Sequence, residues 1–309
     1  MKNICRVILT AAVLVILAGC AGNAPEEAGA SSQKEHGSGL SAGGPHLSDS
    51  GLRRNNIKTK SVGIDPDWEW ADLAEISSGS AVLYMAATGR KDIVIGVNAG
   101  HGTLGGEYAR VYCHPDKTPK VTNGSNPKGS LTAVAVSAGM IFNDGTYESD
   151  VALRCAQILR DILLDHGYDV LMLRDEEDVQ LDNVARSVIA NNTADCLVSL
   201  HWDGDGLDYD KGCFCIPTPD EIKEMEPVAS VWQEHDRLGE ALMDGLRSHK
   251  CRIYQGRNDP LELTQTCYSK IPAALVELGN GASVHDDDTL SNIAAGLFEG
   301  IEDYITRKE

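Results

Sequence analysis

The chain has 309 residues, of which 42% are hydrophobic and 24% are charged, and its formal net charge is −19. This excess of negative charge argues against a nucleic-acid partner, because proteins that bind nucleic acids present basic surfaces. The length suits one folded domain of ordinary size together with shorter terminal segments.

The N-terminus has the pattern of a bacterial export signal. Lys2 and Arg6 precede an apolar run at residues 7–19. This run is shorter than the roughly 20 residues that a membrane-spanning helix needs. The run ends in L-A-G-C, which resembles the lipobox of bacterial lipoproteins. We therefore expect residues 1–19 to be removed and Cys20 to be lipidated, which would anchor the protein in an extracytoplasmic position at the outer face of the membrane. An ordinary secretory signal with an unrelated cysteine is the alternative.

The composition after the signal predicts a tether followed by one domain. Residues 20–60 are rich in Gly, Ser, Ala and Pro, a composition typical of flexible linkers. Residues 61–309 show no long repeat and no second linker, so we expect a single folded unit. Within it, residues 107–145 form a long polar segment, which predicts a functional flap or an irregular excursion. The alternative is that residues 132–142, T-A-V-A-V-S-A-G-M-I-F, add a strand.

The nine cysteines have several roles in this interpretation. Cys155 and Cys196 fall at apolar positions of a predicted helix and strand, where a buried small side chain is expected. Five others lie in loop-like segments, and some of them could pair as disulfides outside the cytoplasm, in a pattern that the sequence leaves open: Cys113, Cys213, Cys215, Cys251 and Cys267. A thiolate zinc site is disfavoured, because Cys213 and Cys215 form C-x-C rather than C-x-x-C.

Strands and helices alternate in the remainder of the chain. Short apolar runs predict buried strands at residues 92–100, 168–175, 194–203 and 271–280. Apolar residues at helical spacing predict helices at residues 148–167, 179–192, 231–250 and 286–305. This alternation predicts an α/β fold, a single domain with a mixed, mostly parallel sheet and helices on both faces.

Four residues with metal-binding or acid–base chemistry fall near the ends of these elements. His101 and His201 come at the carboxyl ends of two predicted strands, Glu277 comes near the end of another, and Glu148 lies in the first turn of a helix. Sites in α/β sheets gather beyond the carboxyl ends of the strands, so we expect these residues to converge. Two His and one Glu can supply three ligands to a catalytic zinc, and a further Glu could move protons. Taken alone, Glu148 is also explained by the helix dipole.

Five sequence blocks in this order resemble the zinc-dependent N-acetylmuramoyl-L-alanine amidases of the amidase-3 type, over residues 92–305. The blocks are I-V-I-G-V-N-A-G-H-G, Y-E-S-D-V-A-L-R-C, L-R-D followed by spaced L, R and A-N, V-S-L-H, and L-V-E-L-G-N. The resemblance implies that His101, Glu148 and His201 bind Zn²⁺ and that Glu277 is the catalytic carboxylate. It implies hydrolysis of the amide between N-acetylmuramic acid and L-alanine in peptidoglycan.

Some residues depart from the family pattern. Asn98 stands where Asp is usual, Leu173 where Thr is common, and Asp203 where Asn is common, and Trp202 is bulkier than the usual residue. These departures bear on substrate fit and regulation rather than on the metal. Two other functions stay open. One is a non-catalytic wall-binding or regulatory lipoprotein of this fold, and the other is a zinc amidase or peptidase for another amide. The sequence also leaves open whether a protein partner activates the enzyme. Three further polar residues are interpreted as structural: Arg174, Arg186 and Asn191.

Overall fold

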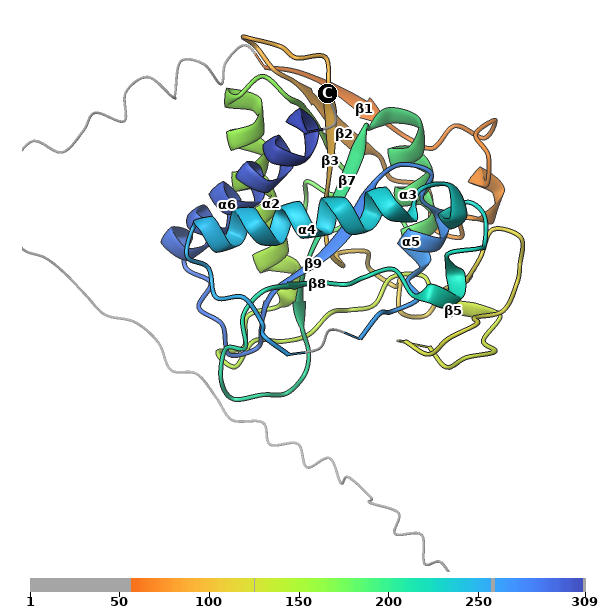
Figure 1. Cartoon of the computed structure of the whole chain (residues 1–309). Helices are drawn as coiled ribbons and strands as arrows, with labels where there is room; N and C mark the ends of the chain where they lie inside the picture. Colours follow the sequence, from red (N-terminus) through yellow and green to blue (C-terminus); the bar gives the residue numbers. More distant parts are fainter. Residues whose placement is uncertain (1–56, 125, 257–258, 308–309) are drawn as a thin grey trace, which may run out of the picture. The chain divides into compact units, whose positions relative to one another are not determined.

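The computed structural model describes residues 57–124, 126–256 and 259–307 (Figure 1). The expected signal segment, the expected lipid site at Cys20 and most of the expected tether lie outside these residues. Among the helices that the structure describes, none is both long and apolar enough to cross a membrane.

One mixed sheet of seven strands forms the centre of the domain. Its strands are β1 (Lys58–Val62), β2 (Ala81–Met85), β3 (Val94–Ala99), β6 (Asp169–Met172), β7 (Cys196–Asp203), β8 (Phe214–Cys215) and β9 (Ala273–Asn280). They lie in the order β1-β2-β6-β3-β7-β9-β8. The four inner strands β6, β3, β7 and β9 run parallel, whereas β1, β2 and β8 pair antiparallel at the two edges.

The four predicted strands are these four inner strands, because burial on both faces gives them continuous apolar sequences. The edge strands were not predicted. β1 has the burial pattern eeeeB, from exposed to buried, and β8 has only two residues, so neither carries an apolar run. β1 also begins at Lys58, three residues before the expected start of the domain at residue 61.

Helices cover both faces of the sheet, as predicted (Figure 1). They are α2 (Glu148–Asp165), α3 (Asn183–Thr193), α4 (Trp232–Ser248), α5 (Thr264–Tyr268) and α6 (Asp287–Thr306), with 3₁₀ turns η2 (Ala71–Leu73), η3 (Asp220–Ile222) and η4 (Val228–Ser230). α2, α4 and α6 pack on one face, where Leu159, Val198 and Leu297 share a core. α3 covers the other face, with Ile189 against Leu171.

The polar segment at residues 107–145 contains a second, two-stranded sheet. β4 (Arg110–Tyr112) pairs antiparallel with β5 (Thr132–Val134), so the alternative of an added strand is confirmed. Glu262 fixes the loop between them, since its carboxylate accepts hydrogen bonds from the backbone N–H groups of Val121 (3.0 Å) and Thr122 (2.8 Å).

The seven cysteines of the described residues form no disulfide with one another, so the loop cysteines do not pair in this structure. Cys155 and Cys196 are fully buried among apolar side chains, as predicted.

Candidate metal centre

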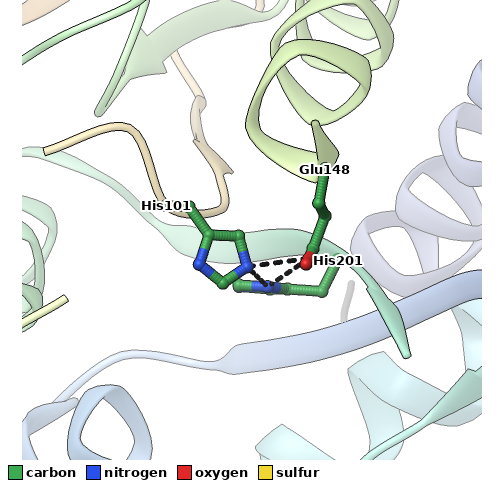
Figure 2. Close-up of side chains that lie close together, drawn as sticks. All are labelled: His101, Glu148 and His201. Carbon is green, nitrogen blue, oxygen red and sulfur yellow. Dashed lines mark hydrogen bonds and ion pairs between the residues drawn. The ribbon is translucent and has the colours of Figure 1, made fainter. Parts of the chain in front are cut away.

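Three side chains from separate elements converge at the carboxyl edge of the sheet (Figure 2). His101 follows β3, Glu148 is the first residue of α2, and His201 lies near the end of β7. β3 and β7 are parallel neighbours, with Ala99 opposite Leu200, so both histidines reach the same edge. His101 Nε2 lies 2.8 Å from Glu148 Oε1, and His201 Nδ1 lies 3.0 Å from His101 Nε2 and 3.1 Å from Glu148 Oε1.

This triangle of donor atoms fits a zinc ion. Nitrogen and oxygen ligands lie about 2.0–2.2 Å from zinc, so three corners of a tetrahedron are separated by about 3.3 Å. The observed separations are only slightly shorter. The donor set of two imidazoles and one carboxylate is also typical of catalytic zinc, which leaves a fourth position for water.

The His101 ring is held in the orientation that metal binding needs. Its Nδ1–H donates to the Ser137 carbonyl oxygen at 2.8 Å, so Nε2 keeps its lone pair for a metal. The backbone of His101 has φ of 63°, in the left-handed region that non-glycine residues rarely adopt. Ser137 lies in the segment for which the sequence predicted a flap, an irregular excursion or an added strand, and its role as a partner of His101 was not predicted.

Glu148 and His201 are in the protonation states that a metal requires. Burial alone would raise the pKa of the Glu148 carboxyl, but its contacts with the two histidine rings lower it well below the usual range. The backbone N–H groups of Met140 (2.8 Å) and Trp202 (3.0 Å) also donate to this carboxylate. Burial lowers the pKa of His201. The site therefore offers an ionised carboxylate and a neutral imidazole at neutral pH.

Two glycines make room for the rings. A Cβ at Gly100 would lie 2.4 Å from His201 Cε1, and a Cβ at Gly139, whose φ is +85°, would lie 2.8 Å from His101 Cδ2. Any side chain at either position would displace a ligand.

Glu277 lies beside the three ligands in a cavity of about 600 Å³ that all four residues line. It stands opposite His201 in the parallel pair β7–β9. Burial, and next the charge of Glu148, raise the pKa of the Glu277 carboxyl well above its usual range. Its Oε2 is buried and has no hydrogen-bond partner among the described residues. The predicted convergence of the four residues is therefore what the structure shows.

The three polar residues interpreted as structural do hold loops. Arg174 donates to the Ala99 and Gly100 carbonyl oxygens (3.2 and 2.9 Å), and Arg186 donates to the His101 carbonyl oxygen (2.7 Å). Both arginines therefore brace the loop that carries His101. Asn191 donates from Nδ2 to the carbonyl oxygen of Tyr268 (2.8 Å).

Two departures from the family pattern, Trp202 and Asp203, leave the ligands undisturbed. The Trp202 ring is 2% exposed and packs edge-on against Phe142, with ring centroids 5.9 Å apart. Asp203 pairs with Lys211, which also contacts Asp205 at 2.9 Å.

A second group of metal-binding residue types lies in the described part of the chain, formed by His114, Glu262 and Cys267. His114 Nε2 lies 2.8 Å from Glu262 Oε1 and 3.9 Å from the Cys267 sulfur. Burial raises the pKa of the Cys267 thiol well above its usual range, so the thiol stays neutral. The Glu262 oxygens already accept from backbone N–H groups, and we interpret this group as a buried clamp between residues 114–122 and the segment before α5.

The fold and the site together give an α/β protein with a candidate three-ligand metal centre and a carboxyl group beside it, the arrangement expected of a metal-dependent hydrolase. Residues 95–303 match the sequence pattern of the family described as N-acetylmuramoyl-L-alanine amidase, Amidase_3. This match includes all four site residues and spans more than half of the chain, and the chain belongs to this family. It is an N-acetylmuramoyl-L-alanine amidase, an enzyme that acts on peptidoglycan. No curated protein sequence matches the chain.

Solved structures of low sequence identity share the fold. The N-acetylmuramyl-L-alanine amidase Ami1 from Mycobacterium smegmatis is 17% identical with a TM-score of 0.58, and the match covers 70% of this chain and 98% of that chain. Ami1 from Mycobacterium abscessus is 19% identical with a TM-score of 0.55, covering 69% and 99%. AmiC2 of Nostoc punctiforme is 18% identical with a TM-score of 0.51, covering 71% and 100%.

Proposed function

We propose that this amidase is zinc-dependent, with His101, Glu148 and His201 as the three protein ligands and Glu277 as the group that moves protons. The observation that carries the proposal is the triangle of three donor atoms, each within 3.1 Å of the others, beside a buried carboxyl group in one cavity. The substrate bond is the amide between the lactyl group of N-acetylmuramic acid and L-alanine.

The chain's own residues divide the work. When bound, zinc would supply the Lewis acidity that polarises the carbonyl group and acidifies water. Glu277 would take the proton from the attacking water and pass it to the nitrogen of the departing L-alanine. Its raised pKa suits a group that must hold a proton between these two transfers. A cation held by the three ligands would oppose this rise in the Glu277 pKa. The carboxyl group could then both accept and release a proton near neutral pH, as general base catalysis requires.

Chelation tests the metal requirement and the identity of the bond together. The full chain would be assayed on peptidoglycan fragments before and after removal of metal, with the newly exposed amino groups identified by residue. We expect one zinc per chain, and L-alanine amino groups that appear, vanish on chelation and return with zinc. Release of another amine would mean that a different amide is the substrate, and cleavage that survives complete metal removal would refute the zinc assignment.

The N-terminal sequence supports the further proposal that this enzyme works outside the cytoplasm on a lipid anchor. L-A-G-C at residues 17–20 and the linker-like composition of residues 20–60 are its basis. Acyl chains on Cys20 would confine the catalytic domain to the reach of the tether from the membrane surface.

A further inference from the structure

One buried side-chain amide nitrogen in the wall of the catalytic cavity has no hydrogen-bond partner among the described residues. Gln265, the second residue of α5, is 9% exposed and lines the same cavity as the three ligands and Glu277. Its Nε2 is buried and makes no hydrogen bond to any described residue. A buried N–H₂ group without an acceptor costs free energy, so the unpaired Nε2 of Gln265 needs an explanation.

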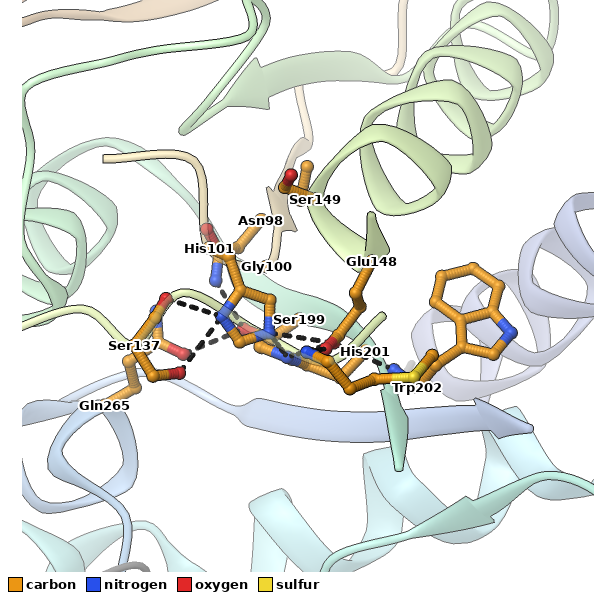
Figure 3. Close-up of polar contacts among 12 residues, drawn as sticks. Asn98, Gly100, His101, Ser137, Glu148, Ser149, Ser199, His201, Trp202 and Gln265 are labelled. Atoms are coloured by element: carbon orange, nitrogen blue, oxygen red, sulfur yellow. Dashed lines mark hydrogen bonds and ion pairs between the residues drawn. The ribbon is translucent and has the colours of Figure 1, made fainter. Parts of the chain in front are cut away.

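The orientation of this amide is dictated by a chain of three hydrogen bonds that begins at Arg186 (Figure 3 draws its last three members, Asn98, Ser199 and Gln265). Arg186 is fully buried and can only donate, and its Nη1 donates to Asn98 Oδ1 at 3.0 Å. The other side of the Asn98 amide is therefore Nδ2, which donates to Ser199 Oγ at 3.2 Å.

The hydroxyl of Ser199 continues the same donor-to-acceptor direction toward Gln265. Because its oxygen accepts from Asn98, its single hydrogen is free to be donated, and it goes to Gln265 Oε1 at 3.3 Å. The carbonyl oxygen of the Gln265 amide is thus used, and both N–H groups of Nε2 remain. Asn98 and Ser199 are 1% and 3% exposed, so water does not compete for these bonds.

We propose that Gln265 is a substrate-binding residue that donates a hydrogen bond from Nε2 to an amide carbonyl oxygen of the bound wall fragment. Asn98 and Ser199 are positioning residues, which act by keeping the donor side of the Gln265 amide toward the cavity. Peptidoglycan fragments carry several neutral amide carbonyls besides the scissile one, and such an acceptor satisfies a buried N–H₂ group without bringing charge into the site. This inference rests on the proposed function, because it takes the same cavity as the amidase site.

Replacing Asn98 by Asp tests the direction of the chain. A carboxylate at residue 98 would accept from both Arg186 and Ser199, so the Ser199 hydrogen would turn away from Gln265. Gln265 could then satisfy Ser199 only as a donor, which would turn its carbonyl oxygen into the cavity. The Gln265 carbonyl oxygen would then face the amide carbonyl oxygen of the wall fragment. Two acceptors repel each other, so the attraction proposed for the unaltered chain would be lost.

The measurement is the Kd of a muramoyl-peptide fragment for the zinc-loaded full chain, by calorimetry, in a Glu277→Gln background that does not turn over. We expect Asn98→Asp to raise Kd about tenfold or more, and Gln265→Leu to raise it about three- to tenfold, the range of one neutral hydrogen bond. Ser199→Ala, which brings no charge, should lie between the parent and Asn98→Asp. Asn192→Asp, which adds the same charge at an exposed residue of α3, should leave Kd unchanged.

The outcomes separate this inference from the proposed function. If the parent binds the fragment and both Asn98→Asp and Gln265→Leu bind within twofold of it, with zinc content retained, Gln265 does not contact the substrate. If the fragment binds but the unaltered chain cleaves no amide, the proposed reaction fails and the role of Gln265 in binding stands. Should Asn98→Asp fold poorly, Gln265→Leu and Ser199→Ala decide the question without a buried charge.

Discussion

At the scale of single residues, position in the fold gives the two glutamates of the site opposite properties. Glu148 receives four polar contacts and stays ionised, which suits a ligand. Glu277 is only partly buried, its Oε2 is buried without a hydrogen-bond partner among the described residues, and its pKa is raised, which suits a group that exchanges protons. Two carboxyl groups in one cavity thus take different roles because of what surrounds each of them.

Replacing Glu277 by Gln keeps the shape of the side chain and removes its ability to exchange protons. We expect kcat/KM for amide cleavage to fall by about 10²–10⁴-fold while zinc content is retained. The measurement is release of L-alanine amino groups from peptidoglycan, with Glu240→Gln, on the exposed side of α4, as the matched control. Undiminished cleavage by the Glu277 variant would show that another group moves the protons.

At the scale of elements, α4 is tied to β9, the strand that carries Glu277, by a buried histidine. His235 Nδ1 accepts from the backbone N–H of Ala273 at 2.9 Å, and the ring is 3% exposed. Burial lowers the pKa of His235 to about 4. Protonation would put a charge in the core and remove the acceptor that Ala273 uses.

The His235 pKa predicts a pH-dependent stability. The charged form is disfavoured in the folded state, so the stabilisation is complete above the unfolded pKa of about 6.5 and is lost as the pH falls toward 4. Urea unfolding of the unaltered chain should lose about 3 kcal/mol more between pH 7 and pH 4 than unfolding of a His235→Gln variant, at about 1.4 kcal/mol per pKa unit. Equal pH dependence of the two proteins would show that His235 is not protonated on unfolding in this range.

The clamp around Glu262 holds the added sheet against the segment that lines the cavity. Hydrogen bonds from His114 and Thr122 lower the pKa of Glu262, although burial would raise it. Glu262→Ala leaves these donors buried without an acceptor, and we expect a loss of about 3 kcal/mol in the free energy of unfolding. Urea titration measures this loss, with Glu224→Ala at an exposed residue as the control. A change in the free energy of unfolding below 0.5 kcal/mol, as at an ordinary surface residue, would show that the clamp is dispensable.

Glu262→Ala should also weaken fragment binding, because Leu261 and Leu263 line the cavity on either side of Glu262.

At the scale of the whole molecule, the parallel centre of the sheet determines where the site forms. β3, β7 and β9 are adjacent and parallel, so His101, His201 and Glu277 are delivered to one edge although they lie far apart in the sequence. α2 begins at the same edge and contributes Glu148. The site therefore depends on the assembled sheet and not on any one segment.

The proposed anchor belongs to the same scale, because it decides which part of the envelope the catalytic domain can reach. Cells fed a labelled fatty acid should incorporate label into the unaltered protein and into Cys5→Ser, a control within the signal segment. Cys20→Ser should incorporate none, since the acyl chains have lost their attachment atom. Label that persists in Cys20→Ser would place the lipid elsewhere or leave an ordinary secretory signal.

From the sequence alone, the α/β class, the four inner strands, the four long helices and the convergence of the four candidate site residues were predicted correctly. These follow from local properties, namely apolar periodicity, residue chemistry and the order of short blocks along the chain. Leu171 and Val198 belong to the cores on opposite faces of the sheet. Because inner strands are buried on both faces, their sequences are apolar runs that can be recognised locally.

Features that depend on contacts between distant residues became visible only in the folded structure. The sequence named Glu148 as a candidate ligand although the helix dipole also explains it, and its contact with both histidines exists only once β3 and β7 bring them to it. Ser137 orients His101 from 36 residues away, and Ser199 orients Gln265 from 66 residues away. Such hydrogen bonds leave no periodic pattern in the sequence, because their geometry exists only once the sheet has assembled and excluded water from the cavity wall.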